Sequence, residues 1–116
     1  MKNLKVKYDE LMKIHRMFMV GVKRYQEALI DKVIDFHTQE CLRDSLIKRF
    51  ELMYDFLVKY LQRYISAVQG ITINSSRKVF QECLSLGLVN KEEMAQLIDL
   101  IKDRNLTKHA YDFYRI

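Results

Sequence analysis

Proline is absent from this 116-residue sequence, and glycine occurs only three times, at Gly21, Gly70 and Gly87. These two residue types interrupt regular secondary structure most often, so their scarcity favours long, continuous helices. Hydrophobic residues make up 49% of the chain, which suits one modest core. We therefore expect a single all-α domain over residues 1–116, an antiparallel up-and-down bundle of four to five helices.

Long apolar runs are missing as well. No run approaches the roughly 18 residues needed to span a bilayer, and the lysine-rich start lacks the continuous apolar stretch of a signal peptide. These absences predict a cytoplasmic protein with no membrane partner. Cysteine is also scarce, and Cys41 and Cys83 stand alone within helical patterns, so we expect reduced, partly buried packing residues. A disulfide, a metal site and any other cofactor are not expected.

Charge is present but is not concentrated. The 20 lysine and arginine residues and the 15 aspartate and glutamate residues give a net charge of +5, with the two signs mixed along the sequence. No polybasic block of lysine and arginine occurs. The charge therefore permits contact with RNA phosphates without requiring it.

Hydrophobic residues recur at spacings of three and four, which is typical of helices with one buried face. The first helix has such a seam over residues 4–36, which consists of Leu4, Tyr8, Leu11, His15, Phe18, Val22, Tyr25, Leu29, Val33 and Phe36. Because His15 falls on this seam, we expect it to be packed rather than catalytic. His37 lies in a polar break and is expected in a loop or at a helix end. The second helix is expected over about residues 40–68, followed by a linker that contains Gly70.

Capping residues predict two further helices. Asn74 or Ser75 can accept hydrogen bonds from the exposed amides that begin a third helix, and Gly87 is suited to ending it. Asn90 can cap a fourth helix, and two glutamates in its first turn are favourably placed near the helix N-terminus.

The end of this fourth helix is the most informative stretch of the sequence. Residues 102–112 are Lys-Asp-Arg-Asn-Leu-Thr-Lys-His-Ala-Tyr-Asp, which places Arg104, His109 and Tyr111 close together along the chain. A guanidinium can clamp and neutralise a phosphoryl group, and an imidazole can give or take a proton near neutral pH. These residue types can therefore carry out phosphate chemistry without a metal.

This run resembles the signature of the HEPN superfamily, in the branch of nucleotidyltransferase substrate-binding proteins. Two other blocks agree in order, because residues 49–59 are similar to the family's second helix and residues 74–88 to its third helix and the following turn. The resemblance spans about residues 47–112, more than half of the chain. Relatives usually continue with another helix after the motif, so we expect this chain, which ends at Ile116, to lack that C-terminal helix.

The resemblance implies a homodimer, because HEPN proteins generally dimerise with the motif lining a shared cleft. It also implies metal-independent cleavage of RNA. His109 would assist proton transfer as the ribose 2′-hydroxyl attacks the neighbouring phosphate, and Arg104 would stabilise the charge that builds on the phosphoryl oxygens. Asn105 and Thr107 would position phosphate or shape the turn.

Acidic residues of the family's second helix lie near the motif, so Glu51 or Asp55 is expected to orient Arg104. The alternative for these acids is a solvent-exposed ladder of ion pairs. In paired nucleotidyltransferase and HEPN modules, the partner enzyme can transfer a nucleotide to the tyrosine of the Arg-x4-His-x-Tyr pattern, here Tyr111. The added anion would block the cleft and cancel the charge that attracts RNA. The resemblance thus implies the toxin of a toxin–antitoxin pair, with a cognate nucleotidyltransferase subunit as partner and RNA as substrate.

Helix geometry leaves two ways to bring the motif together. On a continuous helix at about 100° per residue, Arg104 and His109 lie about 140° apart. Either the helix breaks near Asn105, a residue type that tolerates the left-handed conformation, or two copies pool their motifs across a two-fold axis.

A non-enzymatic function also stays open. The protein would then be a helical accessory subunit that presents substrate to a small, separate nucleotidyltransferase. The chain itself contains no glycine-rich phosphate loop and no glycine-serine turn followed by paired acids, so it has no nucleotidyltransferase site of its own.

Overall fold

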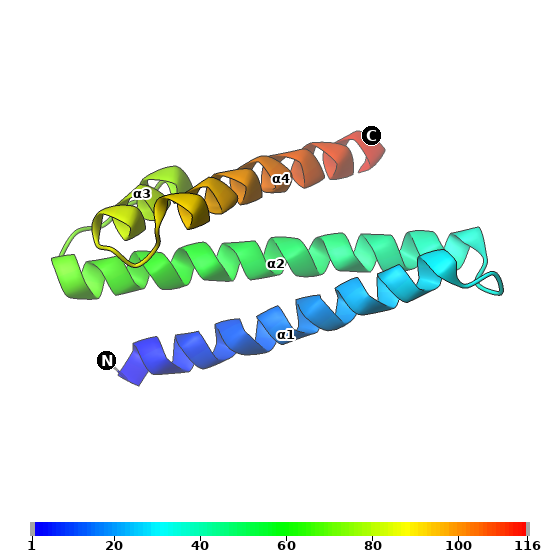
Figure 1. The fold of residues 1–116 in the computed structure, drawn as a ribbon, viewed down its shortest axis with the longest axis horizontal. Coiled ribbons are helices and arrows are strands. Elements are labelled where there is room, and N and C mark those ends of the chain that lie inside the picture. The colour runs from blue at the N-terminus through cyan, green and yellow to red at the C-terminus, as the bar shows by residue number, and fades with distance from the viewer. Residues whose placement is uncertain (1, 116) are drawn as a thin grey trace. The chain divides into compact units, whose positions relative to one another are not determined.

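A computed structural model describes the backbone of residues 2–115 and the side chains of residues 4–107. Four helices occupy this backbone: α1 (Lys2–Ile30), α2 (Phe36–Gln69), α3 (Ser76–Ser85) and α4 (Lys91–Arg115) (Figure 1). No strand occurs between residues 2 and 115. The all-α fold class predicted from the sequence is therefore confirmed.

The chain divides into two compact units, residues 1–56 and residues 57–116. The first unit contains α1 and the part of α2 up to Phe56, and the second contains the rest of α2 together with α3 and α4. Glu51 and Asp55 belong to the first unit, whereas the motif that begins at Arg104 belongs to the second.

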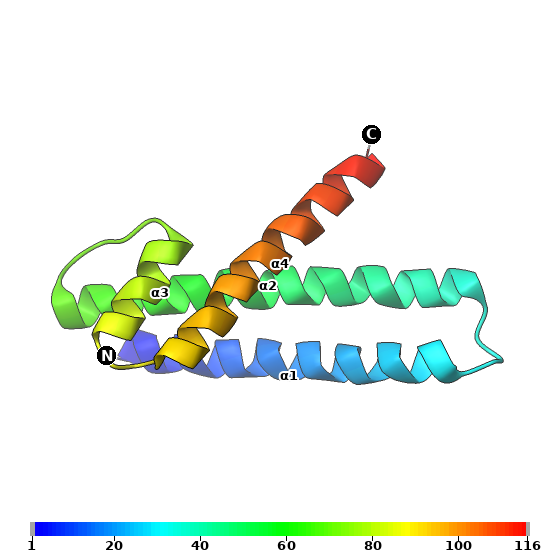
Figure 2. The same cartoon turned by 45° about the horizontal axis from the view of Figure 1, so that its top comes forward.

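The first unit is a hairpin in which α1 and the first part of α2 run antiparallel, side by side (Figure 1, Figure 2). Side chains of α2 bond to backbone carbonyl groups of α1 at two levels. Gln39 donates to the Ala28 carbonyl at 2.9 Å, and Arg49 donates to the Met17 carbonyl at 3.0 Å. Higher residue numbers in α2 meet lower numbers in α1, so these two bonds fix both the direction and the register of the pair.

Apolar contacts support this register. The rings of Phe18 in α1 and Phe50 in α2 have centroids 5.9 Å apart, and Phe50 lies 6.4 Å from Tyr54. Aromatic pairs at such separations stabilise by about 0.5–1.5 kcal/mol beyond the burial of their area. Leu11 and Ala28 of α1 are buried, as is Tyr54 of α2. The predicted seam of the first helix is confirmed at Leu11, which is buried, and at Phe18, which is half-buried, but is wrong at Tyr8 and Leu29, which are exposed.

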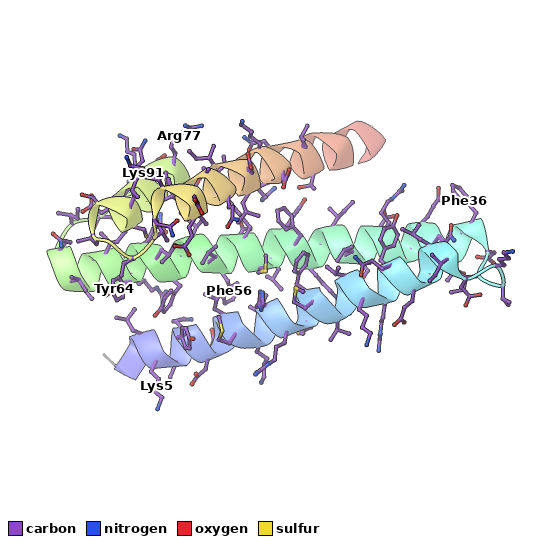
Figure 3. The ribbon with its side chains drawn as sticks, viewed as in Figure 1. Lys5, Phe36, Phe56, Tyr64, Arg77 and Lys91 are labelled. Carbon is purple, nitrogen blue, oxygen red and sulfur yellow. The ribbon has the colours of Figure 1, made fainter. Side chains whose placement is uncertain are left out.

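The far end of that seam was predicted wrongly. In the turn after α1, the Asp31 carboxylate accepts a hydrogen bond from the Val33 amide at 2.9 Å. Asp35 then caps α2, because its carboxylate accepts from the Thr38 amide at 2.7 Å, and α2 begins at Phe36 rather than near residue 40. Val33 and Phe36 are consequently 92% and 72% exposed, and Figure 3 shows Phe36 at the start of α2.

Two side chains of the first unit lie on a different surface from the one predicted. His15 is exposed rather than packed, because position 15 falls at the edge of the buried stripe that runs through Leu11. Cys41 is exposed rather than partly buried, and its Sγ lies 3.8 Å from Nε2 of His37, one helical turn earlier. His37 is exposed in the first turn of α2, which agrees with the expected helix end. Cys83 is fully buried, which is more than the partial burial predicted, and it is a packing residue as expected.

The second unit begins with the end of α2 and a linker. Gly70 follows α2 with a φ of +69°, a conformation that favours glycine, and its amide bonds to the Ser66 carbonyl at 2.9 Å. The Gln62 side chain donates to the Ile73 carbonyl at 2.9 Å and holds the linker against α2. α3 is capped by Ser75, whose hydroxyl accepts from a backbone amide of the first turn at 3.5 Å.

α3 ends in the way that Gly87 predicts. The Gly87 amide donates to the Leu84 carbonyl at 3.1 Å, and the Leu88 amide donates to the Cys83 carbonyl at 3.0 Å. Gly87 has a φ of +76°, so the two bonds and the left-handed residue together form a Schellman motif.

The short turn after Gly87 leads directly into α4 (Figure 2). Asn90 caps α4, because its Oδ1 accepts from the Glu93 amide at 2.8 Å while Glu93 Oε1 accepts from the Asn90 amide at 3.0 Å. This reciprocal pair is a capping box and confirms the predicted start of the fourth helix.

Among the side chains of residues 57–107, five hydrophobic ones are buried, and they come from all three helices of the second unit: Ile65, Val79, Phe80, Cys83 and Met94. Four of these, all except Met94, are less than 2% exposed. In the part of the chain that the structure describes, no helix is both long enough and apolar enough to cross a membrane.

Candidate functional site

α4 passes through the Arg104 motif without interruption and continues to Arg115. Within the described backbone no residue other than glycine has a positive φ, so Asn105 is in the ordinary right-handed helical conformation. Thr107 Oγ1 donates to the Arg104 carbonyl at 2.9 Å, a local bond that is compatible with a continuing helix. The alternative in which the helix breaks near Asn105 is therefore wrong.

The continuous helix fixes the directions in which the motif positions face. Positions 104 and 109 lie about 140° apart around the axis, whereas positions 104 and 111 lie only about 20° apart and about two turns apart along it. A single copy of α4 therefore places positions 104 and 109 on different sides of the helix. The arginine and tyrosine positions share one side.

Arg104 itself is partly built into the fold. Its side chain is half-buried, and its Nη1 atom is shielded from solvent. Arg104 also interacts with another group of the chain. Removing a guanidinium nitrogen from water is unfavourable unless the charge is stabilised by its surroundings. Neighbouring Asn105 is exposed and Thr107 is half-buried.

The side chains of His109 and Tyr111 lie outside the described residues, although the backbone at both positions belongs to α4. The expected roles of His109 in proton transfer and of Tyr111 as a modification site stay predictions.

Glu51 and Asp55 lie one turn apart on α2, on the same face of that helix. Glu51 is half-buried, Asp55 is exposed, and each takes part in an interaction within the chain. Whether either of them orients Arg104 stays a prediction. No group of three or more histidine, cysteine, aspartate or glutamate side chains in residues 4–107 is placed to hold a metal ion.

A groove in the first unit was not predicted from the sequence. It has a volume of about 480 Å³ and is lined by residues from one face of α2: Cys41, Asp44, Ser45, Lys48, Arg49 and Leu52. The sequence pattern gave neither Lys48 nor Arg49 a site of its own. A usable signal was Gly21, which lies off the hydrophobic seam and faces the Arg49 side chain across the hairpin.

The sequence profile of one known family matches residues 8–115 of this chain, and that family is described as nucleotidyltransferase substrate binding protein like. No curated protein and no solved structure gives a significant match. The match covers nearly the whole chain and includes all three blocks on which the resemblance was based. The chain therefore belongs to the nucleotidyltransferase substrate-binding protein-like family, in the HEPN-like branch.

Proposed function

We propose that this protein is the HEPN toxin of a nucleotidyltransferase toxin–antitoxin pair and acts in the cytoplasm as a metal-independent endoribonuclease. The cognate nucleotidyltransferase neutralises it by transferring a nucleoside monophosphate from a nucleoside triphosphate to the Tyr111 hydroxyl, with release of pyrophosphate. Family membership supports the link to a nucleotidyltransferase, and the Arg-x4-His-x-Tyr pattern supports the chemistry.

The reaction divides between two side chains. His109 assists the transfer of the proton from the ribose 2′-hydroxyl as that oxygen attacks the adjacent phosphorus, and the bond from phosphorus to the 5′ oxygen breaks. Arg104 donates hydrogen bonds to the phosphoryl oxygens and stabilises their growing negative charge. Asn105, whose side chain is exposed, positions the phosphate near the arginine, and Thr107 supports the helix through its bond to the Arg104 carbonyl.

The observation that carries the proposal is the continuous α4. Because positions 104 and 109 face about 140° apart, one phosphate meets both side chains most simply between two copies of the helix. The active form is therefore a homodimer in which Arg104 of one copy works with His109 of the other across a two-fold axis.

The same geometry supports Tyr111 as the point of control. Position 111 lies on the same side of α4 as position 104, roughly 10 Å further along the axis. A nucleotide attached there adds negative charge beside Arg104 and fills the space that RNA would occupy.

Mixing two inactive variants tests the shared site. Arg104→Ala and His109→Ala are purified separately, mixed, and allowed to exchange subunits before RNA cleavage is measured. If the site is shared, half of the dimers after random exchange are mixed and each has one intact site, so about a quarter of the wild-type activity returns. If both groups act within one copy, the mixture stays inactive, and that result would overturn the shared cleft.

A second candidate function is favoured by the half-buried Arg104 and by the family's description. The protein would then be a non-catalytic accessory subunit that binds the nucleotidyltransferase and presents its substrate. Under this alternative, His109→Ala binds the cognate nucleotidyltransferase as the wild type does, and the activity of that enzyme is unchanged. Neither the wild type nor His109→Ala cleaves RNA. Loss of RNA cleavage in His109→Ala with unchanged partner binding supports the nuclease instead.

A further inference from the structure

The groove on α2 combines two cations with a hydroxyl group on one helical face. Ser45, Lys48 and Arg49 line it together with Leu52, and the spacing of three and four residues along α2 places them side by side. Because every lining residue comes from one helix, the hollow is an open groove rather than a closed pocket. An open groove suits a chain-like ligand that passes through it.

Arg49 is held in position for binding. Its Nη1 donates to the Met17 carbonyl at 3.0 Å, and its side chain crosses Gly21, where an added Cβ would lie 3.2 Å from Nη1. A guanidinium has five N–H donors in a rigid fork, so one bond to a carbonyl orients the group and leaves the others available.

Among the described side chains, no acid pairs with either of these two cations. Within residues 4–107, neither Lys48 nor Arg49 has a carboxylate within 4.0 Å. Asp44 is the one acid among the residues that line the groove. Its Oδ1 lies 3.5 Å from Nη2 of Arg43, whose positive charge partly offsets that of the carboxylate. A half-buried arginine oriented by a backbone carbonyl and left without a carboxylate is suited to binding an anion.

The stretch of α1 around Met17 is rich in positive charge. Residues 11–26 contain four lysine and arginine residues and no aspartate or glutamate. Met17 and Gly21, which contact Arg49, lie in the middle of this stretch. This part of α1 therefore carries a net charge of +4, which attracts anions to the hairpin at long range.

We propose that this groove binds the backbone phosphates of single-stranded RNA, with Arg49 as a forked donor and Lys48 as a point charge. The inference rests on the proposed function, because it names a surface that holds the RNA substrate. A nucleoside triphosphate presents the same phosphate chemistry, so the test separates the two sources.

Binding is measured with a fluorescent 2′-O-methyl oligonucleotide of about 12 nucleotides, which the nuclease cannot cut, over a series of salt concentrations. The logarithm of the association constant falls linearly with the logarithm of the salt concentration, and each phosphate contact steepens this fall by about 0.7. Lys48→Gln and Arg49→Gln should therefore each make the slope shallower by about 0.7. A change of that size corresponds to about fivefold weaker binding of the oligonucleotide by each variant at 0.1 M salt. Asp44→Asn removes a negative charge from the groove and should therefore strengthen binding of the oligonucleotide. Loss of packing would not produce such a gain in affinity.

Lys5→Gln is the matched control, because it removes an equal charge from an exposed position near the start of α1 (Figure 3). Its slope should equal that of the wild type. Equal slopes for Lys48→Gln, Lys5→Gln and the wild type would overturn the proposal. Binding of ATP that depends on Lys48 and Arg49, with no such dependence for the oligonucleotide, would also overturn it.

Cleavage of an ordinary RNA by the same variants separates the two levels of inference. Cleavage that is independent of Lys48 and Arg49 refutes the groove and leaves the nuclease proposal intact. Binding that depends on the groove, in a protein that never cleaves RNA, refutes the nuclease and leaves the groove as an RNA-binding surface.

Discussion

The capping box of α4 sets where the motif-bearing helix begins, so breaking it should cost a measurable part of the stability. Asn90 and Glu93 exchange two hydrogen bonds of 2.8 and 3.0 Å, and both residues are exposed. Asn90→Ala leaves the first amides of α4 to water and should lower the free energy of unfolding by about 1 kcal/mol. For a domain of this size, that change lowers Tm by roughly 4 °C.

Thermal unfolding followed by far-ultraviolet circular dichroism measures this effect. Asn90→Asp retains the acceptor and adds a negative charge near the helix N-terminus, so its Tm should match or exceed that of the wild type. Gln96→Ala, an exposed change further along α4, is the control and should have little effect. The reasoning is refuted if Asn90→Ala melts like the wild type, or if Asn90→Asp is as destabilising as Asn90→Ala.

The two cysteines and the cap of α2 give the remaining predictions. At pH 8, iodoacetamide should modify exposed Cys41 well before Cys83, because burial and then the charge of Glu82 raise the pKa of the Cys83 thiol; equal rates by mass spectrometry would contradict this. Hydrogen bonds from Thr38 lower the pKa of the Asp35 carboxyl in the folded state, so its stabilising contribution is present above the unfolded pKa and is lost as pH falls through the folded value. Asn at position 35 cannot titrate, so only the wild type loses this contribution as the pH is lowered from 6 to 3. The Tm of Asp35→Asn minus that of the wild type should therefore increase over this range, and a constant difference would contradict the assignment.

Local signals in the sequence predicted the second unit well. Ser75, Gly87 and Asn90 act on backbone groups only a few residues away, so their effects do not depend on the rest of the fold. The motif itself was equally visible, because it is a short pattern on one helix.

Tertiary features of the first unit were predicted less well. The seam over residues 4–36 showed that the first helix has an apolar face, but its spacing could not show that the Asp35 cap would begin α2 early and leave Phe36 in solvent. The exposure of His15 and Cys41 likewise depends on how the two helices pair. The groove at Arg49 requires a contact with Met17, 32 positions away, which no local pattern contains.

RNA cleavage by the full chain in excess chelator, compared with His109→Ala prepared identically, tests the central claim most directly. General acid–base catalysis by a positioned histidine contributes roughly 10²–10⁴-fold, so the variant should lose at least about 100-fold of a chelator-resistant activity while its melting curve is unchanged. Equal cleavage by the two proteins, or no cleavage by either, would contradict a metal-free nuclease that uses Arg104 and His109.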